Sequence, residues 1–207
     1  MRANKNKYFK PSKKKTDILV VYFSAKGFQA NGVLNKGNTE ILAEMIAEEL
    51  GADLFQLVSK NKHYPNDFRP LEGICRKDIE TNARPEYLED VPDFAKYKYI
   101  FVGGPAWYFY FPMIVYTFLD NHDLKDKVLV PFATHVGSGL TGIDQHLEEQ
   151  YPNNEILKGL AVVGVYPQEY PDRARLYVKN WLKDLFWGQT KIASRNYERF
   201  LFVDIFI

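Results

Sequence analysis

The sequence has a single cysteine, Cys75, among its 207 residues, and it has no long uninterrupted apolar run. A lone cysteine cannot form a disulfide within the chain, which is typical of proteins of a reducing cytoplasm. A membrane-spanning helix needs about 20 mostly apolar residues, so no membrane span is expected. Residues 1–16 lack the apolar core of a secretory signal, which also favours a cytoplasmic location.

Histidine is scarce as well. His63, His122 and His146 are scattered along the chain and show no spacing typical of a metal site. His135 stands in a polar loop, where it either contacts a ligand or serves as a structural residue. No Ser-His-Asp or Cys-His arrangement is visible. We therefore predict no metal site and no catalytic side chain.

Charge is unevenly distributed, although the net charge is only +1. Residues 1–15 contain seven basic residues and no acidic one, so the rest of the chain is mildly acidic. We expect residues 1–16 to form a basic, disordered tail. The acidic body argues against a nucleic-acid-binding domain.

At the other end, residues 188–207 finish with the apolar segment FLFVDIFI, which has high β-propensity and little charge. Such a segment can add a strand to a sheet edge, pack over a groove or mediate self-association. We expect residues 188–207 to form a C-terminal extension, and the sequence leaves its role open.

Between these ends, five strand-like segments alternate with helix-like segments, which predicts one α/β domain over residues 17–187 with a parallel sheet covered on both faces. The expected strands are residues 18–23, 52–58, 99–102, 127–132 and 156–165. The expected helices are residues 38–50, 71–82, 113–119, 140–150 and 171–187. Ligands of such sheets bind beyond the carboxyl ends of the strands.

The first of these strands leads into a candidate phosphate site. The apolar run over residues 18–23 stops at Ser24, and a helix begins near Asn38 and Thr39. A helix N-terminus offers unpaired N–H groups and the positive end of the helix dipole, which together bind phosphate without a basic side chain. The alternative is a capped turn that binds no ligand.

Two more loops would converge with the first if the strand order is 2-1-3-4-5. In the loop after the third strand, Trp107 and Tyr108 can stack on a flat ring, although the same aromatics would also suit a partner surface. In the loop after the fourth strand, Thr134 and Ser138 suit the polar edge of such a ring. A phosphate joined to a large flat heterocycle describes flavin mononucleotide (FMN).

The motifs in these loops resemble those of the flavodoxins, in particular bacterial flavodoxin-like proteins whose loops read YFS…GNT, GxPxW and PFxTHxGSG. Here the three motifs occupy residues 22–24 with 37–39, residues 103–108 and residues 131–139. The resemblance implies a flavodoxin-like three-layer α/β/α sandwich with a five-stranded parallel sheet in the order 2-1-3-4-5. It also implies FMN as the cofactor.

The resemblance further implies which residues hold the cofactor, in three groups. The phosphate loop supplies Ser24, Lys26, Gly37, Asn38 and Thr39; the aromatic loop beside the isoalloxazine ring supplies Pro105, Ala106, Trp107 and Tyr108; the opposite edge of the ring meets Thr134, His135, Gly137, Ser138 and Gly139.

Two features depart from the family pattern. Residues 25–36 lengthen the phosphate loop, and this insertion is compatible with a flap over the phosphate site or with a segment that fills it. Phe109 replaces a residue that is commonly glycine, and it is bulky enough to crowd the ring site.

Three functions are consistent with these observations. The first is an FMN electron carrier between redox protein partners. The second is an FMN-dependent NAD(P)H:quinone-type reductase, with a small-molecule electron acceptor and a site that a homodimer could complete. The third is a flavin-free interaction module. In the first two, the cofactor carries the electrons and the protein tunes it.

Overall fold

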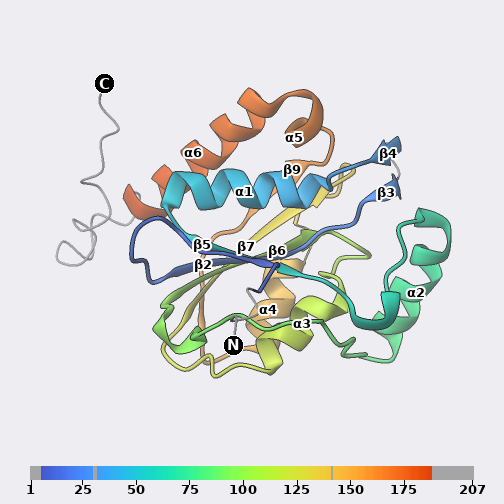
Figure 1. The fold of residues 1–207 in the computed structure, drawn as a ribbon, viewed down its shortest axis with the longest axis horizontal. Helices are drawn as coiled ribbons and strands as arrows, with labels where there is room; N and C mark the ends of the chain where they lie inside the picture. Colours follow the sequence, from blue (N-terminus) through green and yellow to red (C-terminus); the bar gives the residue numbers. More distant parts are fainter. Residues whose placement is uncertain (1–5, 30–31, 141, 188–207) are drawn as a thin grey trace, which may run out of the picture.

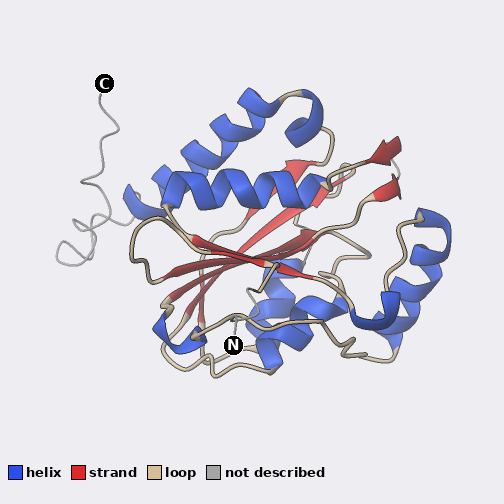
Figure 2. Cartoon of the chain, in the orientation of Figure 1, coloured by secondary structure: helices blue, strands red, loops and turns tan. Residues whose placement is uncertain are grey.

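The computed structural model describes residues 6–29, 32–140 and 142–187. Within them, a seven-stranded sheet lies between two layers of helices (Figures 1 and 2). The strands are β1 (Phe9–Lys10), β2 (Ile18–Phe23), β5 (Asp53–Leu57), β6 (Tyr99–Pro105), β7 (Val128–His135), β8 (Glu155–Ile156) and β9 (Leu160–Val163). The helices that cover one face are α1 (Asn38–Leu50), α5 (Tyr166–Glu169) and α6 (Pro171–Trp187); the other side carries α2 (Phe68–Glu80), α3 (Met113–Asp120) and α4 (Ile143–Gln150). None of the helices in the described ranges has both the length and the apolar character to cross a membrane.

The central strands confirm the predicted topology. The parallel strands lie in the order β5-β2-β6-β7-β9, which is the expected order 2-1-3-4-5. All six residues of β2 are buried, as expected for a strand with helices on both faces. The flavodoxin-like three-layer sandwich is therefore confirmed, and the differences concern the edges of the sheet.

At one edge, the prediction of a disordered tail is wrong for residues 6–16. β1 pairs antiparallel with β5, with Phe9 opposite Phe55, so β5 is not the edge strand that the order 2-1-3-4-5 implies. The backbone N–H of Ser12 also donates to Asp53 Oδ1 over 2.6 Å. These backbone pairings hold the segment on the sheet despite its basic composition. Residues 1–5 lie outside the described residues.

At the other edge, the single strand predicted over residues 156–165 is divided into β8 and β9. Val130 and Pro131 of β7 lie opposite the gap between them. Proline has no N–H to donate to a neighbouring strand, which interrupts the ladder here. By contrast, β6 and β7 each run three residues further than predicted, because their pairing continues from Gly103 to Pro105. The C-terminal extension, residues 188–207, lies outside the described residues.

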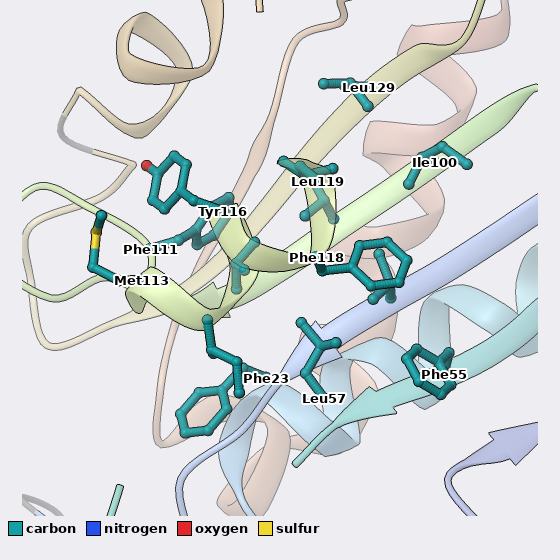
Figure 3. Packing of buried hydrophobic residues seen from close by; sticks show 14 of the residues in the cluster. Phe23, Phe55, Leu57, Ile100, Phe111, Met113, Tyr116, Phe118, Leu119 and Leu129 are labelled. Carbon is teal, nitrogen blue, oxygen red and sulfur yellow. The ribbon is translucent and has the colours of Figure 1, made fainter. Parts of the chain in front are cut away.

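A separate hydrophobic core covers each face of the sheet. On the α3 face, Phe118 and Leu119 pack toward Phe55, Leu57 and Ile100 of the strands (Figure 3). On the α1 face, a second cluster is built from helix side chains and strand side chains, including Leu42, Ile46, Val178, Val20, Phe101 and Val130. Each such side chain contributes about 1.5–3 kcal/mol by burial, so the two cores fix the sheet between its helices.

One buried carboxylate fastens the described N-terminal segment to the sheet. Asp53 is only 3% exposed and accepts hydrogen bonds from Lys96 Nζ (2.8 Å), the Tyr97 hydroxyl (2.6 Å) and the Ser12 N–H. Burial alone would raise the pKa of Asp53, but these hydrogen bonds outweigh that effect, so its pKa lies below the usual value.

Replacing this carboxylate should therefore weaken the fold in a pH-dependent way. Asp53→Asn is expected to lower the free energy of unfolding by about 1–3 kcal/mol at pH 7. Because the pKa of Asp53 is lower in the folded state, its contribution is complete above about pH 5 and is lost as the pH falls below about 4. Urea unfolding at pH 7 and below pH 4 should show that the difference in unfolding free energy between Asp53→Asn and wild type is smaller in acid. Tyr97→Phe, which removes one hydrogen bond, should cost less.

A close contact between β6 and β7 makes a second test. A Cβ added at Gly103 would overlap the ring of Phe132, whereas a Cβ added at Gly73 in α2 would meet no atom within 4 Å. Gly103→Ala should destabilise the protein by about 1–3 kcal/mol through overpacking. Gly73→Ala should stabilise it by about 0.5–1 kcal/mol, because alanine favours a helix interior. Equal effects of the two variants in thermal unfolding would contradict this packing argument.

Candidate functional site

The carboxyl ends of the parallel strands meet at a cavity of about 270 Å³. Residues from the ends of β6, β7 and β9 line it, together with the start of α1 and one face of α2. The cavity thus lies where ligands bind in open parallel sheets. Its size is near the lower end of the range for small-molecule pockets, roughly 300–1,000 Å³.

The start of α1 forms one end of this cavity. The helix begins at Asn38 with Gly37 as its N-cap, so Asn38 and Thr39 lie inside the first turn and neither side chain caps the helix. Ser24 Oγ instead accepts the N–H of Glu40 over 3.0 Å. A Cβ added at Gly37 would overlap Ser24 Oγ, which explains the glycine. The N–H groups of Asn38 and Thr39 have no acceptor within the helix and are available to an anion.

Two side chains of this turn are tied to the cavity. The Thr39 and Thr134 hydroxyls are 2.7 Å apart and both residues are buried, which joins α1 to the end of β7. Asn38 lines the cavity, and its Oδ1 is buried without a hydrogen-bond partner. A buried acceptor without a donor is costly, so this atom favours a ligand that carries an N–H or O–H group.

The aromatic loop forms a second wall. Trp107 and Tyr110 exchange two backbone hydrogen bonds of 2.9 Å around a two-residue turn, and both central residues have positive φ, 49° at Tyr108 and 73° at Phe109. Such turns usually contain Asn or Gly, so two aromatic residues here are strained. Phe109 is 61% exposed and does not line the cavity, so it does not crowd the site as its bulk suggested.

Trp107 lines the cavity and is held from behind by other rings. Its ring meets those of Phe23 and Tyr64 edge-on, with both pairs of centroids 5.7 Å apart. The Ala106 N–H donates to the Thr134 carbonyl over 2.8 Å, which connects the aromatic loop to β7. These contacts fix Trp107 as a rigid surface for a flat ligand.

The insertion over residues 25–36 forms a hairpin of β3 (Gly27–Gln29) and β4 (Gly32–Leu34). It stands beside the cavity and lines it with Gln29 and Leu34, so of the two alternatives the structure has the flap (Figure 1). Gly27 packs so closely on Asn66 that a Cβ would overlap it, and Gln168 donates to the Lys36 carbonyl over 2.6 Å. The hairpin is thereby fastened at both of its ends.

In the third loop only the first predicted residues reach the cavity. Thr134 and His135 line it, and burial lowers the pKa of His135, which favours its neutral form. The Gly137 N–H donates to His135 Nδ1 over 2.9 Å. Six predicted site residues do not line the cavity, and three of them are exposed. The exposed ones are Lys26, Gly137 and Ser138, and the other three are Ser24, Gly37 and Gly139.

Several residues that line the cavity were not predicted from the sequence. α2 contributes Leu71, Glu72 and Cys75, and the loop after β9 contributes Gly164 and Val165. The residues after the fifth strand could have been predicted as site residues, because the carboxyl end of that strand faces the same side of the sheet. By contrast, nothing in the sequence of α2 indicates that this helix lies beside the cavity. Burial, with the nearby charge of Asp78, raises the pKa of Cys75 to about 12, which favours the protonated thiol at neutral pH. No group of three or more metal-ligating side chains occurs in the described part of the chain.

A family model described as flavodoxin matches residues 17–184. The chain belongs to the flavodoxin family. A solved structure of a candidate flavoprotein from Bacteroides uniformis is 26% identical with a TM-score of 0.63, and the match covers 82% of this chain and 99% of that one. For a similar protein from Bacteroides eggerthii the identity is 26%, the TM-score 0.60, and the coverage 81% and 96%.

A flavoprotein from Lactobacillus acidophilus, solved in complex with FMN, is 24% identical with a TM-score of 0.57. The match covers 70% of this chain and 91% of that one, and at this identity it shows a common fold alone. No curated protein matches the sequence.

The hydrogen bond at the start of α1 gives a test of the site without any ligand. Ser24→Ala removes the acceptor of the Glu40 N–H and should lower the free energy of unfolding by about 1 kcal/mol, as other lost caps do. Ser138→Ala changes an exposed loop position and should stay within about 0.5 kcal/mol of wild type. Urea unfolding measures both effects. An unchanged free energy of unfolding in Ser24→Ala would contradict the role given to this hydrogen bond.

Proposed function

We propose that this flavodoxin-family protein binds FMN and acts in electron transfer. The observation that carries the proposal is one cavity that joins a helix N-terminus to an aromatic wall. The α1 end offers N–H groups for a phosphate, and Trp107 and Tyr108 offer surfaces for a flat ring. The FMN complex of a protein with the same fold supports the choice of flavin.

The donors and acceptors of the cavity fit this cofactor. Phosphate needs N–H and O–H donors, which the first turn of α1 and the Thr39 hydroxyl supply. The orphan acceptor Asn38 Oδ1 needs a donor, and the hydroxyls of the ribityl chain are donors. FMN would supply the transfer of one or two electrons, a chemistry that side chains do not provide. The role of the chain is to hold, orient and partly cover the ring.

An electron carrier also needs a surface on which redox protein partners can dock. Val136 lines the cavity and is 86% exposed, and Phe109 extends from the neighbouring loop. This exposed apolar rim supports docking of a protein partner over the cavity. We place the protein in the cytoplasm, a proposal supported by its single, buried cysteine.

The hairpin favours a second candidate, an FMN-dependent NAD(P)H:quinone-type reductase. Gln29 and Leu34 of the hairpin line the cavity together with Leu71 of α2, and side walls of this kind suit a site that also receives a small electron acceptor. A homodimer could close such a site further. Steady-state oxidation of NADH or NADPH with a quinone separates the two: turnover favours the reductase, and its absence favours the carrier.

The proposal predicts a yellow protein. After addition of FMN and desalting, the visible flavin bands should persist with quenched fluorescence, because the ring stacks on aromatic side chains. Riboflavin, which lacks the phosphate, should bind at least tenfold more weakly. Thr39→Val should also weaken FMN binding about tenfold, since it removes the hydroxyl proposed to donate to the phosphate.

Thr81→Val serves as the matched control, because Thr81 lies at the far end of α2 and its hydroxyl donates to the Lys77 carbonyl of the same helix. It should leave FMN binding unchanged. A wild-type protein that emerges colourless and does not quench FMN would overturn the proposal and leave a flavin-free interaction module as the best account.

A further inference from the structure

Helix α2 holds one wall of the cavity in place through two charged side chains. The Tyr108 hydroxyl donates to Glu72 Oε1 over 2.6 Å, and the Arg76 guanidinium lies 4.5 Å from the centre of the Tyr108 ring. Glu72 and Arg76 are one helical turn apart, with 3.7 Å between Oε1 and Nη2. We call these three residues the tyrosine clasp. It joins the strained turn of the aromatic loop to α2.

The two aromatic residues of the wall are supported differently. Trp107 packs edge-on against Phe23 and Tyr64, so the core fixes it. Tyr108 is 37% exposed and depends on the clasp for its position. Tyr108 lines the cavity and Arg76 does not, so the guanidinium contacts the ring without being part of the cavity wall.

The clasp also brings charge to the cavity. Among the described residues that line it, Glu72 is the only one with a formal charge, since partial burial lowers the pKa of His135 and favours its neutral form. The hydrogen bond to Glu72 is the main reason that the pKa of Tyr108 is raised, which agrees with an anionic carboxylate beside the phenol. Arg76 supplies the opposite charge behind the ring.

We propose that Glu72 and Arg76 are positioning residues that fix Tyr108 at the cavity wall and set, with opposite signs, the charge beside a bound flavin. This inference rests on the proposed binding of FMN. A negative charge disfavours the addition of electrons to a nearby ring, and a positive charge favours it. Glu72 therefore lowers the reduction potential of the bound flavin, and Arg76 raises it.

The test compares Glu72→Gln with Arg76→Gln in FMN-loaded protein at physiological ionic strength. Both variants loosen the clasp, so both should weaken the binding of oxidised FMN. Their potentials should move in opposite directions: Glu72→Gln favours reduced FMN and Arg76→Gln disfavours it. The measured quantity is the ratio of the dissociation constants for oxidised and reduced FMN in each variant. Because both side chains are partly exposed, we expect this ratio to change about two- to fivefold from wild type.

The controls are Glu80→Gln and Lys77→Gln, which make the same charge changes on the same helix at exposed positions outside the cavity lining. Glu80 lies about 12 Å further along the helix axis than Glu72, beyond the Debye length of about 8 Å at physiological salt. Potentials that move in the same direction in the two test variants, or equally in the controls, would overturn the charge roles of Glu72 and Arg76.

A flavin-free measurement separates the clasp from the proposed function. In an ultraviolet pH titration, with Tyr108→Phe subtracted to isolate this phenol, Glu72→Gln should lower the pKa of Tyr108. An unchanged pKa would overturn the clasp even if FMN binds. If the pKa falls but no variant retains FMN, the clasp stands and the proposed function fails, together with the effect on the potential.

Discussion

The structure depends on the pairing of β2 between β5 and β6, with helices over both of its faces. β2 runs parallel to β5 and β6, and β6 runs parallel to β7. The carboxyl end of β2 therefore brings Ser24 and the following loop to the side of the sheet where β6 and β7 also end. The cavity is a consequence of this parallel arrangement, since the chain must leave every strand on the same side. Each connection then adds its own chemistry to a common place.

The polar groups around the start of α1 fall into two sets. Some are hydrogen-bonded within the protein, and the others have no partner in the described residues. Ser24 satisfies the Glu40 N–H, and Thr39 satisfies Thr134. Asn38 Oδ1 and the first N–H groups of α1 remain, one an acceptor and the others donors. A ligand that pairs with both must carry donors and an anion together, which is a narrower requirement than the shape of the cavity imposes.

The sequence was sufficient for the parts of the fold that depend on local pattern. Continuous apolar runs predicted the central strands, and the resemblance to the flavodoxins supplied their order. The Gly37-Asn38-Thr39 segment predicted the helix start that faces the cavity. Contacts between distant residues could not be predicted in this way. The antiparallel pairing of β1 with β5 depends on backbone hydrogen bonds, which the basic composition of the segment does not predict. Likewise, Glu72 reads as a surface residue of a helix, and only tertiary packing brings it to Tyr108.

The interrupted fifth strand has a consequence for how the molecule meets other chains. A long, flat edge strand presents a row of unpaired N–H and C=O groups that invites edge-to-edge aggregation. In the described residues, one edge of the sheet is the two-residue strand β1, and the other is divided into β8 and β9 opposite Pro131. Neither offers a long ladder to a neighbouring molecule. A proline inside β7 thus keeps this edge of a strongly apolar sheet short.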